Sequence, residues 1–187
     1  MISESSGKFL VQLARDVIVS ELKEEVIVIP PEYPRELDQR TGIFVTLFKK
    51  MSGFRQLRGC IGLAYPEKPL VEGCVQAAIA VLKDDRFPAI KLEDVDSIEV
   101  EVSVLTEPTR MTVEKPEDYL EKIEIGRDGL IIKKGIMSGL LLPQVPVEQA
   151  WDVQQYLNNL CIKAGLSENT WLDPAAEIYR FKSQIFK

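Results

Sequence analysis

The chain of 187 residues contains no histidine. Imidazole is the usual general base near neutral pH and the commonest metal ligand in proteins. Its absence excludes catalytic triads and dyads built on histidine, and zinc or iron sites with histidine ligands. A reaction carried out by this chain would need a carboxylate, a lysine or an ionised thiol in place of imidazole.

Cysteine is scarce, and the three residues present indicate neither disulfides nor a metal site. Cys60, Cys74 and Cys161 are odd in number, lie within apolar patterns and form no metal-binding spacing. We therefore expect free thiols in a reducing compartment, with Cys74 and Cys161 on apolar helix stripes in the core. No metal site is predicted, and the residues identify no cofactor.

Long apolar runs and clusters of positive charge are also absent. No stretch approaches the roughly 18 consecutive apolar residues of a spanning helix, and the first residues do not resemble a secretory signal. A cytoplasmic protein without membrane segments is predicted. The net charge is −6 and the basic residues are scattered singly, which argues against direct nucleic-acid binding.

The patterns that are present predict an α+β protein of one domain. An amphipathic helix begins at Ser5 or Ser6, and Ser52 and Gly53 form a turn between two strands of a hairpin. Prolines at 30, 31 and 34 forbid regular structure, and a lobe boundary is predicted there. Further strands are predicted at 42–49, 54–62, 98–105, 130–133, 139–142 and 176–186, and further helices at 69–81 and 147–164.

The most conspicuous motif is residues 57–62, Leu-Arg-Gly-Cys-Ile-Gly, which we call the hexapeptide. In an extended strand successive side chains point to opposite faces, so Leu57 and Ile61 would anchor the core, with Arg58 and Cys60 together on the other face. A neighbouring guanidinium favours the thiolate form of cysteine. Cys60 and Arg58 are therefore candidate catalytic residues.

The two glycines of the hexapeptide are candidate binding residues. Gly59 and Gly62 give the backbone conformations closed to other residues, so their N–H groups could converge on an anion. In the alternative interpretation they mark a bulge or tight bend, and Cys60 is a small buried residue beside a surface arginine. The sequence leaves both interpretations open.

Two further segments carry charged candidates. Residues 84–88 either aim Arg86 into a cleft as a binding residue or form a local Asp–Arg pair in a solvated turn. Glu99 and Glu101 share one face of a strand, where Glu101 could act as a catalytic carboxylate or the pair could hold a hard metal ion. Such a row is more often the wet side of an antiparallel sheet.

A third group of candidates follows the prolines at 143 and 146. Gln144 is a turn amide, and Glu148 lies in the predicted first turn of a helix that also carries Trp151. Both Gln144 and Glu148 are candidate binding residues. The helix dipole and core packing also explain Glu148 and Trp151 without any function.

The hexapeptide resembles the hallmark segment of the AMMECR domain family, named for a human chromosomal-region gene product. The resemblance extends over nearly the whole chain. In order, the matching segments are 42–47 (Gly-Ile-Phe-Val-Thr-Leu), 84–87 (Asp-Asp-Arg-Phe), 101–105 (Glu-Val-Ser-Val-Leu), 126–129 (Gly-Arg-Asp-Gly) and 142–145 (Leu-Pro-Gln-Val), with Glu148 and Trp151.

This resemblance implies a single AMMECR-like domain over residues 1–187. A larger and a smaller lobe, with antiparallel or mixed sheets flanked by helices, would enclose a cleft lined by the hexapeptide. The family has no assigned reaction, and its prokaryotic members tend to occur with Memo-like and radical SAM proteins, which implies a shared modification pathway. Eukaryotic members carry a histidine where Asp128 stands, so Asp128 is not predicted to be an indispensable base.

Three functional hypotheses remain at this stage, of which the last is a structural lobe of a larger modification complex. The first is an enzyme whose cleft places Arg58, Cys60 and Arg86 around a small anionic or acyl substrate, with Glu101 or Glu148 handling protons. The second is a non-catalytic binding or scaffold module that presents the same cleft to a partner protein or a nucleotide. They differ in the state of Cys60, since only the enzyme needs a reactive thiol.

Overall fold

The computed structural model describes residues 1–65 and 68–187 and divides the chain into two compact units. Unit 1 comprises Met1–Leu105 and Gln184–Lys187, and unit 2 comprises Thr106–Ser183. The lobe boundary predicted at prolines 30–34 is wrong. Ile29 and Tyr33 pack on the core of unit 1, which keeps the proline-rich segment within that unit.

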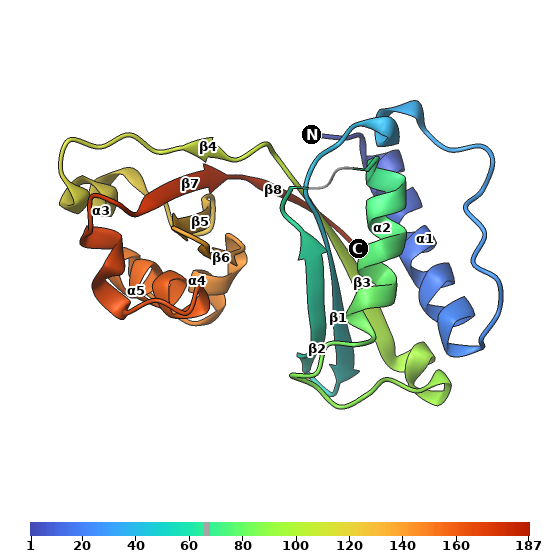
Figure 1. The fold of residues 1–187 in the computed structure, drawn as a ribbon. Coiled ribbons are helices and arrows are strands. Elements are labelled where there is room, and N and C mark those ends of the chain that lie inside the picture. Colours follow the sequence, from blue (N-terminus) through green and yellow to red (C-terminus); the bar gives the residue numbers. More distant parts are fainter. Residues whose placement is uncertain (66–67) are drawn as a thin grey trace. The chain divides into compact units, whose positions relative to one another are not determined.

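Unit 1 is a four-stranded sheet with two helices on one of its faces (Figure 1). The strand order is β2-β1-β3-β8, so β2 and β8 are the edge strands. Its elements are α1 (Glu4–Leu22), η1 (Arg35–Asp38), β1 (Ile43–Met51), β2 (Phe54–Leu63), α2 (Leu70–Val81), η2 (Leu92–Ser97), β3 (Ile98–Leu105) and β8 (Ser183–Phe186).

The core of unit 1 lies between the helices and the sheet. Alternate residues of β1, such as Val45 and Leu47, are fully buried there, as their β-strand period requires. Cys74 of α2 is buried in the same core, which confirms its structural assignment. The helix cap differs from the prediction, because α1 begins after Ser3, whose hydroxyl accepts a hydrogen bond from the Ser6 N–H.

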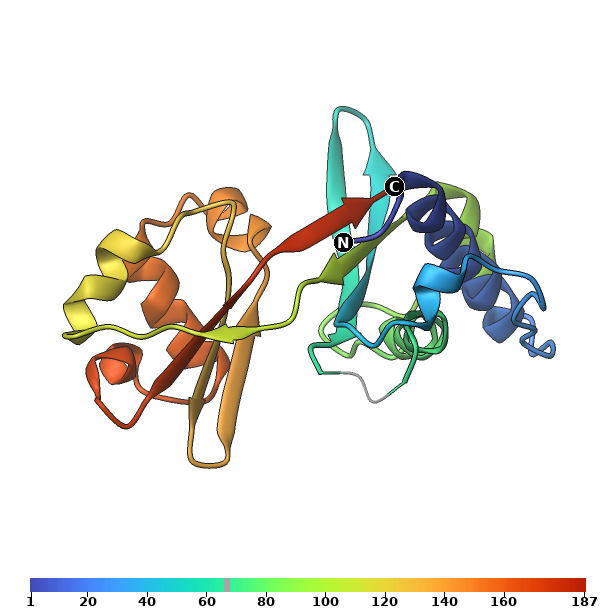
Figure 2. The ribbon, with the colours of Figure 1, turned by 90° about the horizontal axis from the view of Figure 1, so that it is seen from above.

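Both ends of the chain belong to unit 1 and lie side by side (Figure 2). The Gln184 side chain exchanges two hydrogen bonds of 3.0 Å with the backbone of Ile2. The predicted strand 176–186 is therefore two strands in different sheets, β7 (Glu177–Phe181) in unit 2 and β8 in unit 1. The predicted strand divides because the ring of Phe186 packs tightly over Gly7 of α1, in the core of unit 1.

Unit 2 contains a second four-stranded sheet of order β4-β7-β5-β6. The β5–β6 hairpin confirms the predicted pair of strands, and Gly135 adopts the positive φ of 59° that its turn requires. Its elements are β4 (Thr109–Arg110), η3 (Pro116–Asp118), α3 (Tyr119–Lys122), β5 (Gly129–Lys134), β6 (Met137–Leu141), α4 (Gln144–Glu148), α5 (Val153–Lys163), η4 (Glu168–Leu172) and β7 (Glu177–Phe181).

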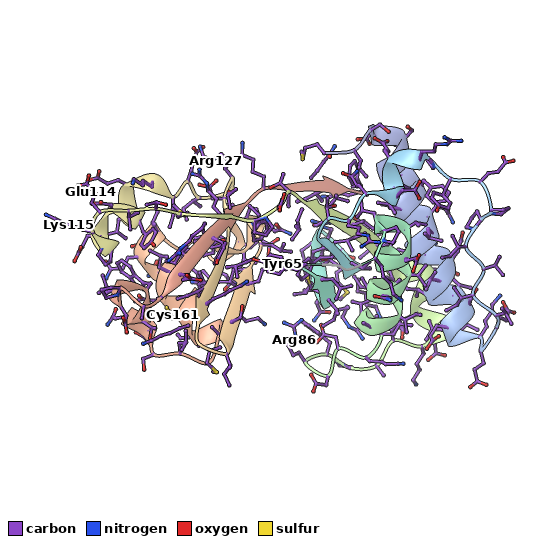
Figure 3. All side chains as sticks on the ribbon, turned by 45° about the horizontal axis from the view of Figure 1, so that its top comes forward. Tyr65, Arg86, Glu114, Lys115, Arg127 and Cys161 are labelled. Carbon is purple, nitrogen blue, oxygen red and sulfur yellow. The ribbon has the colours of Figure 1, made fainter. Side chains whose placement is uncertain are left out.

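The helix predicted at 147–164 is two helices. Ala150 has a φ of 52°, which breaks the helical path after α4, and Asp152 caps α5 by accepting the Gln155 N–H at 2.8 Å. Gly165, with a φ of 73°, follows the end of α5 as predicted. Cys161 is buried in the core of unit 2 (Figure 3).

These elements confirm an α+β fold with antiparallel sheets. Within residues 1–65 and 68–187, no helix combines the length and the apolar character needed to cross a membrane.

Candidate functional site

The hexapeptide forms the second half of β2 and contains a β-bulge. Gly59 pairs with Leu47 of β1, whereas Leu57 pairs with the next residue, Phe48, so Arg58 is one extra residue without a cross-strand partner. A bulge reverses the alternation of side chains on its two sides. The bulge interpretation of the motif is therefore the correct one for its backbone.

The bulge changes the predicted placement of Leu57. Phe48 lies on the face of the sheet away from the helices, and Leu57 shares that face and is 38% exposed. The prediction that Leu57 anchors the core is wrong, because the strict alternation of side chains that it assumed does not continue through a bulge. Beyond it the pattern holds, since Gly59 is buried and Ile61 packs on the core of unit 1.

Arg58 does not act on the Cys60 thiol as predicted. Its Nη2 donates to the Pro88 carbonyl oxygen at 3.2 Å, and its Nε is buried without a hydrogen-bond partner among the described residues. The guanidinium whose charge favours the Cys60 thiolate belongs to Arg86. Arg58 thus joins β2 to the loop that follows α2.

Asp84 and Arg86 clamp the backbone of Cys60 on the free edge of the sheet. The Cys60 N–H donates to Asp84 Oδ2 at 2.9 Å, and Arg86 Nη2 donates to the Cys60 carbonyl oxygen at 2.9 Å. The two side chains also bind each other, with Arg86 Nε and Nη2 at 2.7 and 2.6 Å from the carboxylate oxygens. We call this arrangement the edge clamp. It satisfies backbone groups that an edge strand otherwise leaves unpaired.

The edge clamp resolves the two interpretations of residues 84–88. A local Asp–Arg pair is present, but it is not a solvated one, because the Asp84 side chain is only 2% exposed. The hydrogen bonds from Arg86 hold the pKa of the Asp84 carboxyl below its usual range. Arg86 lies on the loop after α2 (Figure 3), and its guanidinium donates a hydrogen bond to the backbone of β2.

The glycines of the hexapeptide are explained by close packing. A Cβ at Gly62 would lie 2.2 Å from the Ile43 carbonyl oxygen, and one at Gly59 would lie 2.9 Å from Val81 Cγ2. Neither glycine is among the positive-φ residues, so the left-handed conformations that a convergent anion nest would use are not adopted here.

Cys60 lies in a polar row that crosses three strands. Thr46 of β1 pairs with Cys60 of β2 and with Glu101 of β3, which places the three side chains on the sheet face away from the helices. The Thr46 hydroxyl donates to Cys60 Sγ at 3.3 Å. The next residue of β3 on this face is Ser103, whose hydroxyl is buried without a hydrogen-bond partner among the described residues. We call these four side chains the polar row.

The Cys60 thiol is held in its neutral form. Burial raises its pKa, and the hydrogen bond from Thr46 and the charge of Arg86 only partly oppose this effect. A thiol whose pKa lies above its ordinary value of about 8.5 carries little thiolate at neutral pH. The geometry therefore gives no support to a poised cysteine nucleophile.

Glu101 is buried and paired with cations, so the strand face that carries it is not simply a solvent-exposed one. It is 4% exposed, and its Oε2 lies 3.3 Å from Arg55 Nη1 and 3.4 Å from Lys187 Nζ. Arg55 also binds Glu99 at 3.1 Å. No group of three or more potential acidic or thiol metal ligands gathers in the described part of the chain.

Sequence reasoning missed several residues of this face. Arg55 and Lys187 hold Glu101, Thr46 contacts Cys60, and Asp84 completes the edge clamp. Strand alternation within 43–51 could have placed Thr46 opposite the core residues Val45 and Leu47. No local sequence pattern predicts the contact of Lys187 with Glu101, because the position of Lys187 depends on β8 joining the sheet of unit 1.

The remaining candidates lie in unit 2. Gln144 opens α4, and its Oε1 is buried without a hydrogen-bond partner among the described residues. Glu148 is the last residue of α4, not a first-turn residue, because the helix begins earlier than predicted. Trp151 packs on the core of unit 2. The structure groups Arg58, Cys60, Arg86 and Glu101 in unit 1, and the cleft between two lobes stays a prediction.

Comparisons with known proteins agree with this architecture. Residues 11–186 match the AMMECR1 family. Protein MJ0810 of Methanocaldococcus jannaschii is 50% identical over all of this chain and 92% of its own length, and Protein TK0174 of Thermococcus kodakarensis is 47% identical with the same coverage. The crystal structure of an uncharacterized protein, PH0010 of Pyrococcus horikoshii, superposes with a TM-score of 0.92 at 48% identity, covering 98% of this chain and 92% of that one.

Proposed function

The chain belongs to the AMMECR1 family, and from this premise we propose that its polar row is a binding site that positions a group of a substrate or partner. The chemistry on that group would be done by a radical SAM or Memo-like protein of the same modification pathway. The observation that carries the proposal is the geometry of Cys60, whose backbone is fixed by the edge clamp and whose thiol accepts from Thr46, in one row with the buried, ion-paired Glu101.

The state of each side chain favours positioning over nucleophilic attack. Nucleophilic catalysis by cysteine needs a thiolate and a nearby base, and Glu101 is already bound to two cations. A fixed backbone with a donor hydroxyl, a thiol and a carboxylate in one row is instead suited to hold a polar group in one orientation. Cys60 is the member of the row that is only partly buried, so its thiol is the group that a ligand would meet first.

The thiol state is tested by site-resolved alkylation. Iodoacetamide labelling of Cys60, followed by mass spectrometry between about pH 6 and 10, should show a rate midpoint above the ordinary thiol pKa of about 8.5. Cys74 serves as an internal reference, since burial raises its pKa to about 12. A midpoint well below about 8 would refute positioning by a neutral thiol and favour the cysteine enzyme.

Binding is tested with purified Memo-like and radical SAM proteins. Cys60→Ala removes the one side chain of the polar row that is only partly buried, with folding checked by thermal melting. We expect this variant to bind the partner about two- to tenfold more weakly, because a ligand hydrogen bond contributes about 0.5–1.5 kcal/mol.

A second pair of variants supplies the matched control. Glu101→Gln should also weaken binding, whereas Glu25→Gln, the same change on an exposed residue after α1, should not. Equal effects of both changes would contradict a role for the polar row. Failure of the wild-type chain to bind either protein would remove the pathway assignment.

A further inference from the structure

A polar pocket lies wholly within unit 2, apart from the hexapeptide. Its volume is about 410 Å³, which is within the range of small-molecule sites. It is lined by residues of the β4 and β7 region and of the turn before β5, namely Thr106, Thr109, Arg127, Arg180, Phe181 and Lys182. Three of its six lining residues are cations, in a chain whose net charge is −6.

A buried carboxylate outside the pocket lining holds one of the lining arginines. Asp128 is fully buried and accepts from Arg127 Nε at 2.9 Å, from Arg127 Nη2 at 2.8 Å and from the Glu124 N–H at 2.9 Å. Burial alone would raise the pKa of Asp128, but these hydrogen bonds outweigh it and lower the pKa. Arg127 (Figure 3) is thus neutralised locally, since it also pairs with Glu124.

The positive charge of the other two cations is not cancelled in the same way. Arg180 reaches Asp128 only at 3.8 Å and is 41% exposed along its side chain. Lys182 is exposed and forms no ion pair within the residues that the structure describes. The backbone fixes both, because Arg180 pairs with Thr109 across β4 and β7, and the Lys182 carbonyl accepts the Thr106 N–H at 2.9 Å.

Thr106 adds a directed donor to these charges. Its Oγ1 accepts the Lys182 N–H at 2.9 Å, so its own O–H is left to donate. The pocket therefore offers a guanidinium, an ammonium and a hydroxyl, all on neighbouring strand segments.

We propose that this pocket binds the phosphate group of a small phosphorylated molecule, held by Arg180, Lys182 and the Thr106 hydroxyl. A phosphate oxygen cluster accepts several donors at once and matches a guanidinium in bidentate geometry. Phe181 is 1% exposed and offers no open ring for a base to stack on, which favours a small ester over a nucleotide. The proposal does not depend on the function proposed for the polar row.

The test is a titration of the full chain with inorganic phosphate and with glycerol 3-phosphate in low-salt buffer. Calorimetry gives the affinity, and amide chemical shifts at Thr106, Arg180 and Lys182 locate the ligand. We expect saturable binding in the range of about 0.01–5 mM. Arg180→Gln should weaken it at least about tenfold and Lys182→Gln about threefold or more, with folding checked by thermal melting.

Lys163→Gln is the matched control, because it removes one positive charge from the exposed end of α5, outside the pocket. It should leave the affinity within about twofold of wild type, since screening limits remote charges. Three outcomes would overturn the proposal: no saturable binding up to about 20 mM, equal weakening by Lys163→Gln, or a preference for malonate over both phosphate compounds.

Discussion

Asp84→Asn is the sharpest test of the edge clamp, because it changes the charge of one buried side chain and almost nothing of its shape. The carboxylate accepts hydrogen bonds from the Cys60 N–H and from two nitrogens of Arg86. Charge-assisted hydrogen bonds contribute about 1.5–3 kcal/mol each when measured by mutation. An amide keeps one acceptor oxygen, so part of this set survives.

The expected loss is therefore smaller than the sum of the bonds. Removing one partner of a fully buried pair costs about 3–5 kcal/mol, but the Arg86 side chain is 46% exposed and can turn to water. We expect Asp84→Asn to lower the free energy of unfolding by about 2–3 kcal/mol and the melting temperature by about 4–12 °C. Hydrogen exchange of the Cys60 amide should quicken with it.

The pH dependence gives a second, independent readout. The pKa of Asp84 is lowered in the folded protein, so its stabilisation is present above the unfolded pKa of about 4 and disappears as the pH falls through the lower folded value. Urea unfolding at pH 7 and near pH 3 should therefore show a large difference between wild type and Asp84→Asn at pH 7 and a smaller one at pH 3.

Asp85→Asn is the matched control, since its side chain is exposed and adjacent. It should change the free energy of unfolding by less than about 0.5 kcal/mol. The clamp would be refuted if Asp84→Asn behaved like Asp85→Asn at pH 7, or if its destabilisation did not change with pH.

Two further predictions concern the hexapeptide itself. Gly62→Ala should lower the free energy of unfolding by more than Gly59→Ala, because its new Cβ would meet the Ile43 backbone whereas Gly59 faces a Val81 methyl group that can shift; urea titration would contradict this if the order were reversed. Leu57→Ala should cost less than about 1 kcal/mol, whereas Leu47→Ala in the core should cost about 2–5 kcal/mol, and similar losses in urea unfolding would place Leu57 in the core after all.

Much of the fold was accessible from local pattern. The hairpin at Ser52 and Gly53, the strand at 98–105 and the helix at 70–81 follow from strict periods and turn residues, and all are present. The errors arise where a long-range contact overrides the local pattern. The strand predicted at 176–186 divides because Phe186 packs over Gly7 at the other end of the chain, a pairing that no local window contains.

The candidate site remains a prediction, and its local geometry was only partly accessible from the sequence. The density of unusual residues in 57–62 indicated the correct strand, but the bulge at Arg58 depends on the register with β1, which the sequence of β2 alone does not specify. Arg86 was singled out as a candidate binding residue. In the structure it contacts the Asp84 carboxylate and the Cys60 carbonyl oxygen, and a backbone carbonyl carries no sequence signal, so its role in fixing Cys60 could not be inferred.

Two of the segments that resemble the family, 57–62 and 84–87, are joined by the edge clamp and therefore form one structural unit. Asp84 and Arg86 take the place of a neighbouring strand, and Gly59 is needed because a side chain there would press on Val81 beside that loop. The edge clamp binds only the backbone N–H and carbonyl of Cys60. The Cys60 side chain therefore lies on the sheet face that also carries Thr46 and Glu101. The edge clamp thus holds the strand of the hexapeptide rigid around Cys60, which is what the binding role that we propose for the polar row requires.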